Sequence, residues 1–419
     1  MLQLREYQIK ISAQAAEVLE HKKIVYLAMA VRTGKTITAL NTAKLFGAKK
    51  VLFLTKKKAI SSIQWDYDNF GFTFDLTVIN DESLHLVTDI YDLIIHDEHH
   101  RFGAFPKPNK VAQLFKKRYS KLPMIFLSGT PTPESHSQWF NQFWVSDYSP
   151  FKQYTNFYKW AVDYVDVKEK RLGYAVIKDY SQAKEQLIRR MTQHYIITFT
   201  QAQAGFTTSV NEMILECEMQ PITNLIINKL KKNLVVKNTD GQVILGDTGV
   251  KLQQKHLQIA SGTCKFEDGS SKIIDNSKAL FIKEKFSDHK IAIFYKFKEE
   301  LNMLKEVFKD KLTTDLEDFN NSDKWIALQF LSGREGVSLK MADYIVAINI
   351  DFSATTYFQF RDRMTTMDRK ENTLFWVFSK DTKDLKSIER VVYQSVLNKK
   401  DFTISIYKKT FENNLHILK

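Results

Sequence analysis

Short, uninterrupted apolar runs constrain the fold of this chain more than any other feature of its sequence. In the first half such runs occupy residues 24–28, 51–54 and 124–127, and runs with a single polar residue, Thr77 or Asp92, occupy 76–79 and 91–95. Segments with helical spacing separate them. Four or five consecutive apolar residues without alternation are typical of strands buried on both faces, and such strands occur in parallel sheets covered by helices. The first half is therefore predicted to form an α/β domain.

The same alternation returns late in the chain. Apolar runs occur at 291–295, 325–328, 344–348 and 374–378, with helical spacing over 298–308. A second parallel sheet is therefore predicted. Residues 138–232 are rich in aromatic residues at helical spacing, which predicts a packed helical extension, with core packing favoured over stacking on bases. Turn residues at 238–241 and 267–270 predict short hairpins. We expect two domains, 1–200 and 201–419.

Charge gives a first indication of the partner. The chain has 61 Lys and Arg against 48 Asp and Glu, a formal net charge of +13, which favours a polyanion such as nucleic acid. A basic surface without function explains the same excess. Two cysteines are too few for a disulfide framework, so a cytoplasmic setting is expected. The apolar runs are too short to span a bilayer and the first residues do not resemble a secretory signal, so no membrane partner is expected.

Residues 32–36, Arg-Thr-Gly-Lys-Thr, lie between the first apolar run and a helical segment. Backbone N–H groups in such a loop, together with a helix N-terminus, form a cradle for phosphate. Lys35 can reach the β- and γ-phosphates and the Thr36 hydroxyl can ligate Mg²⁺. Met29 stands where the first glycine of the usual pattern would be. The alternative is a helix-capping turn, but the strand–loop–helix context favours a site for ATP and Mg²⁺.

Two adjacent acids follow the apolar run at 91–95. Side chains at the carboxyl end of a parallel strand point toward the ligand site of the sheet. Asp97 is therefore predicted to hold Mg²⁺, and Glu98 to orient or deprotonate the attacking water. A zinc site made of His96, His99 and His100 is the alternative. Its spacing differs from that of a zinc-protease helix and the segment follows a strand, so zinc is not expected.

Several segments of the chain occur in the order of the motifs of one large family. In the first half they are 4–8, 32–36, 51–55 with Trp65, 79–84, 97–100 and 128–131. In the second half they are 293–295, 332–339 with Ala342, and 357–363. Together they resemble the superfamily-two helicases, and within them the Snf-type and phage-encoded branch. This resemblance covers nearly the whole chain and implies two tandem RecA-like domains.

The resemblance also implies roles for individual residues. Nucleotide binding is implied for Arg5, Gln8, Arg32, Thr33, Gly34, Lys35, Thr36 and Gly336. Coupling between nucleotide and nucleic acid is implied for His100, Ser128, Thr130 and Gln359. Contact with nucleic acid is implied for Thr55, Ser83 and Ser332. Lys56 and Lys57, beside Lys58, follow a strand end and could hold phosphates, although a solvated charge run is almost as well supported.

The family places two arginines in its last motif, and one of them departs from the pattern here. Arg363 matches the first and is predicted to act as the arginine finger on the γ-phosphate. Thr366 occupies the position of the second. Arg369 or Arg361 could take its place, and the sequence leaves this open.

The resemblance implies an ATP-dependent helicase or translocase in which the two domains clamp ATP·Mg²⁺ and hydrolysis drives movement along nucleic acid, DNA more than RNA. Two alternatives stay open. One is a duplex translocase or remodeller that does not separate strands, and the other is an ATP-gated loader with little turnover. A monomer is favoured. If the chain is phage-encoded, it would act in the host cytoplasm, with phage or host replication and recombination proteins as possible partners.

Overall fold

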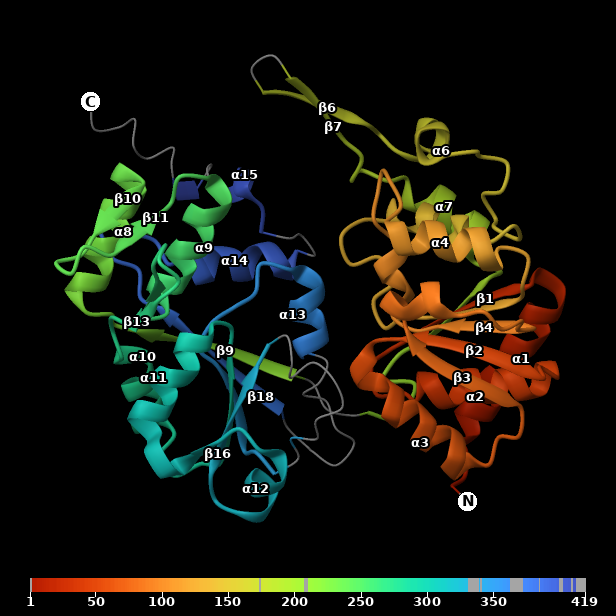
Figure 1. Cartoon of the computed structure of the whole chain (residues 1–419), viewed down its shortest axis with the longest axis horizontal. Helices are drawn as coiled ribbons and strands as arrows, with labels where there is room; N and C mark the ends of the chain where they lie inside the picture. Colours follow the sequence, from red (N-terminus) through yellow and green to blue (C-terminus); the bar gives the residue numbers. More distant parts are fainter. Residues whose placement is uncertain are drawn as a thin grey trace. The chain divides into compact units, whose positions relative to one another are not determined.

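The computed structural model describes residues 2–172, 175–206, 210–330, 339, 341–361, 372–383, 385–398, 402–407 and 410–411. The chain divides into two compact units, Met1–Phe206 and Thr207–Lys419 (Figure 1). Each unit is built around its own six-stranded sheet.

The first unit contains a parallel sheet in the order β3-β2-β4-β5-β1-β8. Its strands are β1 (Ile24–Met29), β2 (Lys50–Thr55), β3 (Asp75–Asn80), β4 (Leu93–His96), β5 (Met124–Leu127) and β8 (Ile196–Phe199). Each apolar run of the first half corresponds to one of the first five strands. β4 begins two residues later than the run at 91–95, and the Asp92 carboxylate before it accepts hydrogen bonds from the backbone N–H groups of Lys49 and Lys50.

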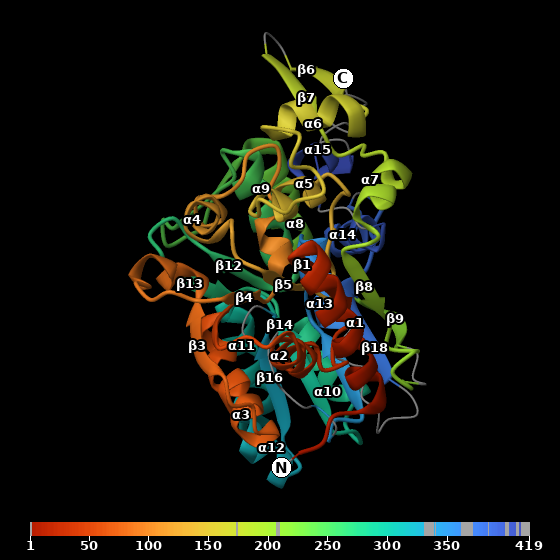
Figure 2. The ribbon, with the colours of Figure 1, turned by 90° about the vertical axis from the view of Figure 1, so that its right-hand side faces the viewer.

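Alternate strand residues face the two helical layers of this sheet. Val25 and Leu27 pack in one core with α1 (Glu6–Lys22), α2 (Lys35–Phe46) and α3 (Ile60–Phe70). Ile24 and Tyr26 pack in the other with α4 (Lys110–Tyr119) and α5 (Gln138–Trp144). Figure 2 shows α1 beside α2 on the first of these faces. Burial on both faces explains why these strands are apolar at successive positions.

The aromatic segment after residue 138 only partly matches the predicted helical extension. It contains α5, α6 (Phe157–Tyr164) and α7 (Glu185–Thr192). However, an antiparallel hairpin of β6 (Lys168–Leu172) and β7 (Ala175–Asp179) interrupts the helices and runs outward beside α6 (Figure 1). Phe140, Phe143 and Trp160 are buried in the core of this unit, where packing was predicted.

The second unit repeats the architecture with a parallel sheet in the order β15-β16-β14-β17-β18-β9. Its strands are β9 (Val210–Cys217), β14 (Ile291–Tyr295), β15 (Leu312–Thr313), β16 (Trp325–Gln329), β17 (Tyr344–Ala347) and β18 (Asn372–Ser379). The prediction of two parallel sheets flanked by helices is therefore confirmed. β9 was not predicted as a strand and lies inside the expected helical extension, where it pairs with β18 along its whole length.

Helices cover this second sheet as well. They are α8 (Pro221–Asn233), α9 (Gly249–Ala260), α10 (Ser277–Lys285), α11 (Lys298–Phe308), α12 (Leu316–Asn321), α13 (Ala354–Arg361), α14 (Ile388–Leu397) and α15 (Ile404–Tyr407). Both predicted hairpins are present, as β10 (Val235–Lys237) with β11 (Val243–Leu245) and β12 (Thr263–Lys265) with β13 (Ser271–Ile273). Among the described residues, no helix is both long and apolar enough to cross a membrane.

Candidate active site

The predicted phosphate loop connects the end of β1 to the start of α2. Arg32 and Gly34 both have positive φ angles, of 65° and 78°. Glycine is required at 34 for a second reason, because a Cβ there would lie 2.1 Å from Nε2 of Gln8. The Thr33 hydroxyl and the Lys35 ammonium both donate to the carbonyl of Ala30, at 2.7 and 3.3 Å. The loop is thus closed on itself, with α2 beginning at Lys35.

The start of α1 is attached to this loop. The Gln8 side-chain oxygen accepts a hydrogen bond from the Arg5 backbone N–H at 2.8 Å. Tyr7 donates its hydroxyl to the carbonyl of Thr33 at 3.1 Å, and Arg5 donates to that same hydroxyl at 3.2 Å. Arg5 and Gln8, residues that the resemblance assigns to nucleotide binding, therefore lie next to the phosphate loop, although they are more than 20 residues away in sequence.

The two acids lie directly after β4. Burial and the neighbouring Glu98 raise the pKa of Asp97 to about 6, and the charge of Lys35 acts in the opposite direction. The Thr55 hydroxyl donates to Oδ2 of Asp97 at 3.0 Å. Glu98 has a φ of 50°, and its carboxylate lies 3.2 Å from Nδ1 of His100. This strand end therefore brings Asp97 within electrostatic reach of the phosphate-loop lysine.

The coupling residues of the first unit meet at the same edge of the sheet. Nδ1 of His100 lies 2.9 Å from the Ser128 hydroxyl, which also accepts the backbone N–H of Thr130 at 3.2 Å. Burial lowers the pKa of His100 to about 4, so the ring is neutral at pH 7. A Cβ on Gly129 would lie 3.3 Å from a Val31 methyl carbon and 3.5 Å from the Lys35 ammonium. Segments 32–36, 97–100 and 128–130 are thus in direct proximity.

The first-unit residues assigned to nucleic acid differ in accessibility. Thr55 is buried and its hydroxyl donates to the Asp97 carboxylate, so this side chain lies beside the acids that follow β4. Lys56 is half-buried and Lys57 is exposed, while the side chain of Lys58 lies outside the described residues. Ser83 is half-buried on η2, the 3₁₀ segment Asp81–Leu86 that follows β3.

In the second unit, several predicted site residues lie outside the described residues. They are Ser332, Gly336, Arg363, Thr366, Arg369 and the side chain of Gln359. Arg361 is described, and its Nε lies 3.0 Å from the carboxylate of Glu212 on β9. Tyr357 and Trp376 also donate to this carboxylate. Glu212, which no sequence pattern indicated, thus connects β9 to α13. Because Arg361 is engaged in this ion pair, it is a weaker candidate for the second arginine finger.

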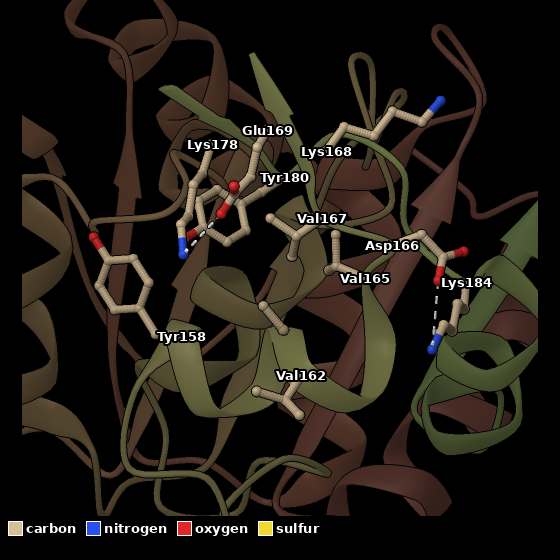
Figure 3. Close-up of a pocket in the computed structure, with 11 residues that line it drawn as sticks. Tyr158, Val162, Val165, Asp166, Val167, Lys168, Glu169, Lys178, Tyr180 and Lys184 are labelled. Atoms are coloured by element: carbon tan, nitrogen blue, oxygen red, sulfur yellow. Dashed lines mark ion pairs between the residues drawn. The ribbon is translucent and has the colours of Figure 1, made fainter. Parts of the chain in front are cut away.

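A separate pocket lies between α6 and the β6–β7 hairpin (Figure 3). Tyr158 and Val162 on α6 are 46% and 76% exposed. Lys178 points toward Glu169, and Lys184 toward Asp166, at 3.4 and 3.6 Å (Figure 3). Among the described residues, no predicted nucleotide-site residue lines this pocket.

Comparisons with known proteins bear on the class of the chain. Residues 1–71, which include the phosphate loop, match the family model of the type III restriction enzyme, res subunit. No curated protein matches the sequence. The structure is similar to the Sulfolobus solfataricus SWI2/SNF2 ATPase core in complex with dsDNA, at 15% identity and a TM-score of 0.42, over 98% of this chain and 93% of that chain.

A second similar structure is the ATP-dependent type ISP restriction-modification enzyme LlaBIII bound to DNA. It is 15% identical with a TM-score of 0.51, over 95% of this chain and 29% of that chain. This chain therefore spans less than a third of that protein, and the similarity supports the fold. It confirms the predicted fold of two parallel sheets flanked by helices, and the family match over residues 1–71 agrees with the predicted phosphate loop.

Proposed function

We propose that this chain hydrolyses ATP in response to DNA and uses the hydrolysis to move along it. The observation that carries the proposal is the meeting of Lys35, Asp97 and the His100–Ser128 pair at one edge of the first sheet. Phosphoryl transfer requires a phosphate-binding cation, an acid that holds Mg²⁺ and a group that orients water. The similar enzyme LlaBIII is ATP-dependent and is bound to DNA in its structure, which supports the choice of nucleic acid.

The residues of the first unit fit a bound magnesium ion. Asp97 offers a buried carboxylate whose pKa is raised by burial and by Glu98, so a nearby divalent cation would favour its charged form. Thr36, half-buried at the start of α2, would supply the hydroxyl ligand. Mg²⁺, when bound, offsets the charge of the phosphate oxygens. Lys35 binds the phosphates from the loop, and the Asp97 carboxylate is oriented by Thr55.

Glu98 is proposed to orient the attacking water or accept its proton. Its side chain is 28% exposed, so water can reach it, and it lies 3.2 Å from a ring nitrogen of His100. His100 links Glu98 to Ser128, and we propose that this link couples the nucleotide to the bound strand. We propose that the RecA-like domains comprise 1–200 and 201–419, and that Arg363 of the second stabilises charge on the γ-phosphate.

The net positive charge of the chain and two lysines after a strand support DNA contact by the first unit. Lys56 and Lys57 follow β2, and Ser83 follows β3 on η2, so all three lie at the carboxyl edge of neighbouring strands. Phosphate contacts of this kind hold a strand without reading its sequence. We propose translocation along DNA as the activity, with or without separation of the strands. An ATP-gated loader with little turnover is the competing function.

An ATPase assay over a panel of nucleic acids tests the proposal. The full chain would be given single-stranded, duplex and branched DNA, and RNA, at low and high salt. We expect DNA to raise kcat, with an effect that weakens steeply as salt rises because phosphate contacts release counterions. Hydrolysis that no nucleic acid alters would contradict the proposal. Salt-sensitive DNA binding with almost no turnover would instead favour the loader.

A further inference from the structure

Two buried histidines flank the catalytic acids and contact each other. His96 is the last residue of β4, and His99 begins the 3₁₀ segment His99–Phe102, so the residues between them are Asp97 and Glu98. Both side chains are fully buried, and their Nδ1 atoms lie 2.5 Å apart. The ring of His99 stacks on Phe126, with centroids 3.6 Å apart and planes 5° apart. Each ring is therefore held in one orientation.

The first ring connects to the segment that follows β3. Nε2 of His96 lies 3.1 Å from Oδ1 of Asp81, and Arg101 pairs with the other oxygen of that carboxylate at 2.5 Å. Asp81 is the first residue of η2 and is only 4% exposed. Arg118 on α4 also holds η2, through the carbonyls of Leu84, His85 and Val87. A displacement of η2 would thus be transmitted to His96 through Asp81.

The second ring connects to the loop after β5. Nε2 of His99 lies 2.8 Å from the backbone carbonyl of Gln142 on α5. The Gln142 amide donates to the carbonyl of Pro131 at 2.8 Å, and its oxygen accepts the Tyr26 hydroxyl at 2.8 Å. Pro131 directly follows the 128–130 segment that contacts His100. A chain of hydrogen-bonded residues therefore runs from η2 to this loop, and it includes the two histidines that flank the acids in sequence.

We propose that Asp81, His96, His99 and Gln142, here called the histidine relay, position Asp97 and Glu98 according to the state of η2. The inference rests on the proposed function, because it takes η2 to lie against DNA. The relay is separate from the His100–Ser128 contact, which does not involve Asp81. Directional contacts between fully buried groups define one arrangement of the backbone, whereas apolar side chains of the same size would pack without that directionality. The relay residues act through the acids and are positioning residues.

Substitution of His99 tests the relay. His99→Asn can retain a contact near the Nδ1 position and His99→Gln one near the Nε2 position, so each interrupts the chain on a different side. We expect either change to lower the DNA-stimulated kcat about tenfold, a typical size for coupling between sites. The unstimulated kcat, the KM for ATP and the Kd for DNA should stay within about twofold. The matched control is His256→Asn, because His256 is also buried and its ring bonds to Tyr407 in the second unit.

Other outcomes would overturn the relay. Equal losses of stimulated and unstimulated rates would mean that His99 only maintains the fold, and unchanged stimulation would mean that the chain of contacts transmits nothing. If the His99 variants do not fold, Tyr26→Phe removes one hydroxyl at the Gln142 end. It should lower the DNA-stimulated kcat about threefold while the unstimulated kcat, the KM for ATP and the Kd for DNA stay nearly unchanged. No reduction of the stimulated kcat would count against the relay.

The relay and the proposed function can fail separately. If DNA does not stimulate the wild-type protein, the proposed function is wrong, and the contacts can still be judged by nuclear magnetic resonance of the ¹⁵N-histidine-labelled chain. Asp81→Asn should then shift the ring nitrogen resonances of His99, which lies two hydrogen bonds away. Unchanged His99 resonances would overturn the relay whatever the ATPase result.

Discussion

The two units share a sheet architecture but place their buried charges differently. In the first unit, Lys35, Asp97 and Glu98 lie at the carboxyl edge of the sheet, beside segments that contact one another. In the second unit, Lys278 on α10 and Glu389 on α14 form an ion pair that is fully buried. Lys278 also donates to the carbonyl of Ile348 at 3.0 Å. One arrangement gathers charges at the edge of a sheet, and the other uses them to attach helices to a sheet.

This difference shows why a common fold does not indicate which half carries the chemistry. Both sheets have apolar strands covered on both faces, so their cores differ little in composition. Buried charges are costly unless they are paired or neutralised. In the second unit each member of the Lys278–Glu389 pair satisfies the other. In the first, burial leaves the pKa of Asp97 raised, which is the perturbation expected at a site that binds a cation.

The largest expected effects come from the two residues that are predicted to carry the chemistry in the first unit. Lys35→Ala and Glu98→Gln should each reduce kcat by roughly a thousandfold or more. They should differ in binding, because Lys35 contacts phosphates before hydrolysis while Glu98 acts on the attacking water. We expect weaker ATP binding for Lys35→Ala and bound, unhydrolysed ATP for Glu98→Gln, measured with a fluorescent nucleotide. Hydrolysis at the wild-type rate by Glu98→Gln would remove it from the mechanism.

The second prediction asks whether the other unit supplies part of the chemistry. Arg363→Ala should lower kcat by about a thousandfold, the scale of a lost arginine finger, with ATP and DNA binding nearly intact. Arg369→Ala shows whether Arg369 replaces the second arginine. Arg361→Ala serves as the comparison, because Arg361 pairs with Glu212 and should affect stability more than turnover. If Arg361→Ala alone abolished turnover, the assignment within this motif would have to change.

The third prediction concerns the structural role of the second unit's charges. Lys278→Met leaves Glu389 buried without its cation and should lower the free energy of unfolding by about 3–5 kcal/mol. Urea unfolding followed by fluorescence measures this loss. The double variant Lys278→Met/Glu389→Leu should recover most of it, because no unpaired charge remains. If Lys278→Met instead reduced ATP affinity without a loss of stability, the pair would have a functional role and the contrast between the units would fail.

The smallest expected effect is a pH dependence of stability. Burial lowers the pKa of His256 in the second unit to about 3, from a usual value near 6.5. The unfolded chain then binds a proton below pH 6.5 that the folded chain does not, so stability is lost as pH falls. The loss should be about 1.4 kcal/mol per pH unit, and so about 2 kcal/mol between pH 6.5 and 5.

Thermal melts between pH 5 and 7 measure this effect. His256→Gln should flatten the pH dependence, while His194→Gln, at an exposed position, should leave it unchanged. A slope equal to wild type in His256→Gln would contradict the assignment. The first unit should show a similar acid sensitivity, because burial also lowers the pKa values of His99 and His100.

The sequence predicted best those elements whose signal is local. Apolar runs identified strands β1 to β5 and β14, β16, β17 and β18, because burial on both faces requires apolar residues at successive positions. It missed β8 and β9, the last strands at one edge of each sheet. β9 contains Asn211, Glu212 and Glu216, so its apolar stretch is only the three residues 213–215. The β6–β7 hairpin was missed because aromatic spacing suggested helix throughout that segment.

What the sequence determined by itself was the identity of the chemical groups. Lys35 and Thr36 could be predicted because they lie between a strand and a helix, and Asp97 and Glu98 because they follow a strand end, where side chains of a parallel sheet face a ligand. Only the tertiary structure decided their partners. Thr55 and Asp97 are 42 residues apart, and Tyr26 and Gln142 are 116 residues apart. Such contacts depend on strand order and helix packing, because these bring distant residues to one edge of the sheet. No local sequence pattern specifies either of them.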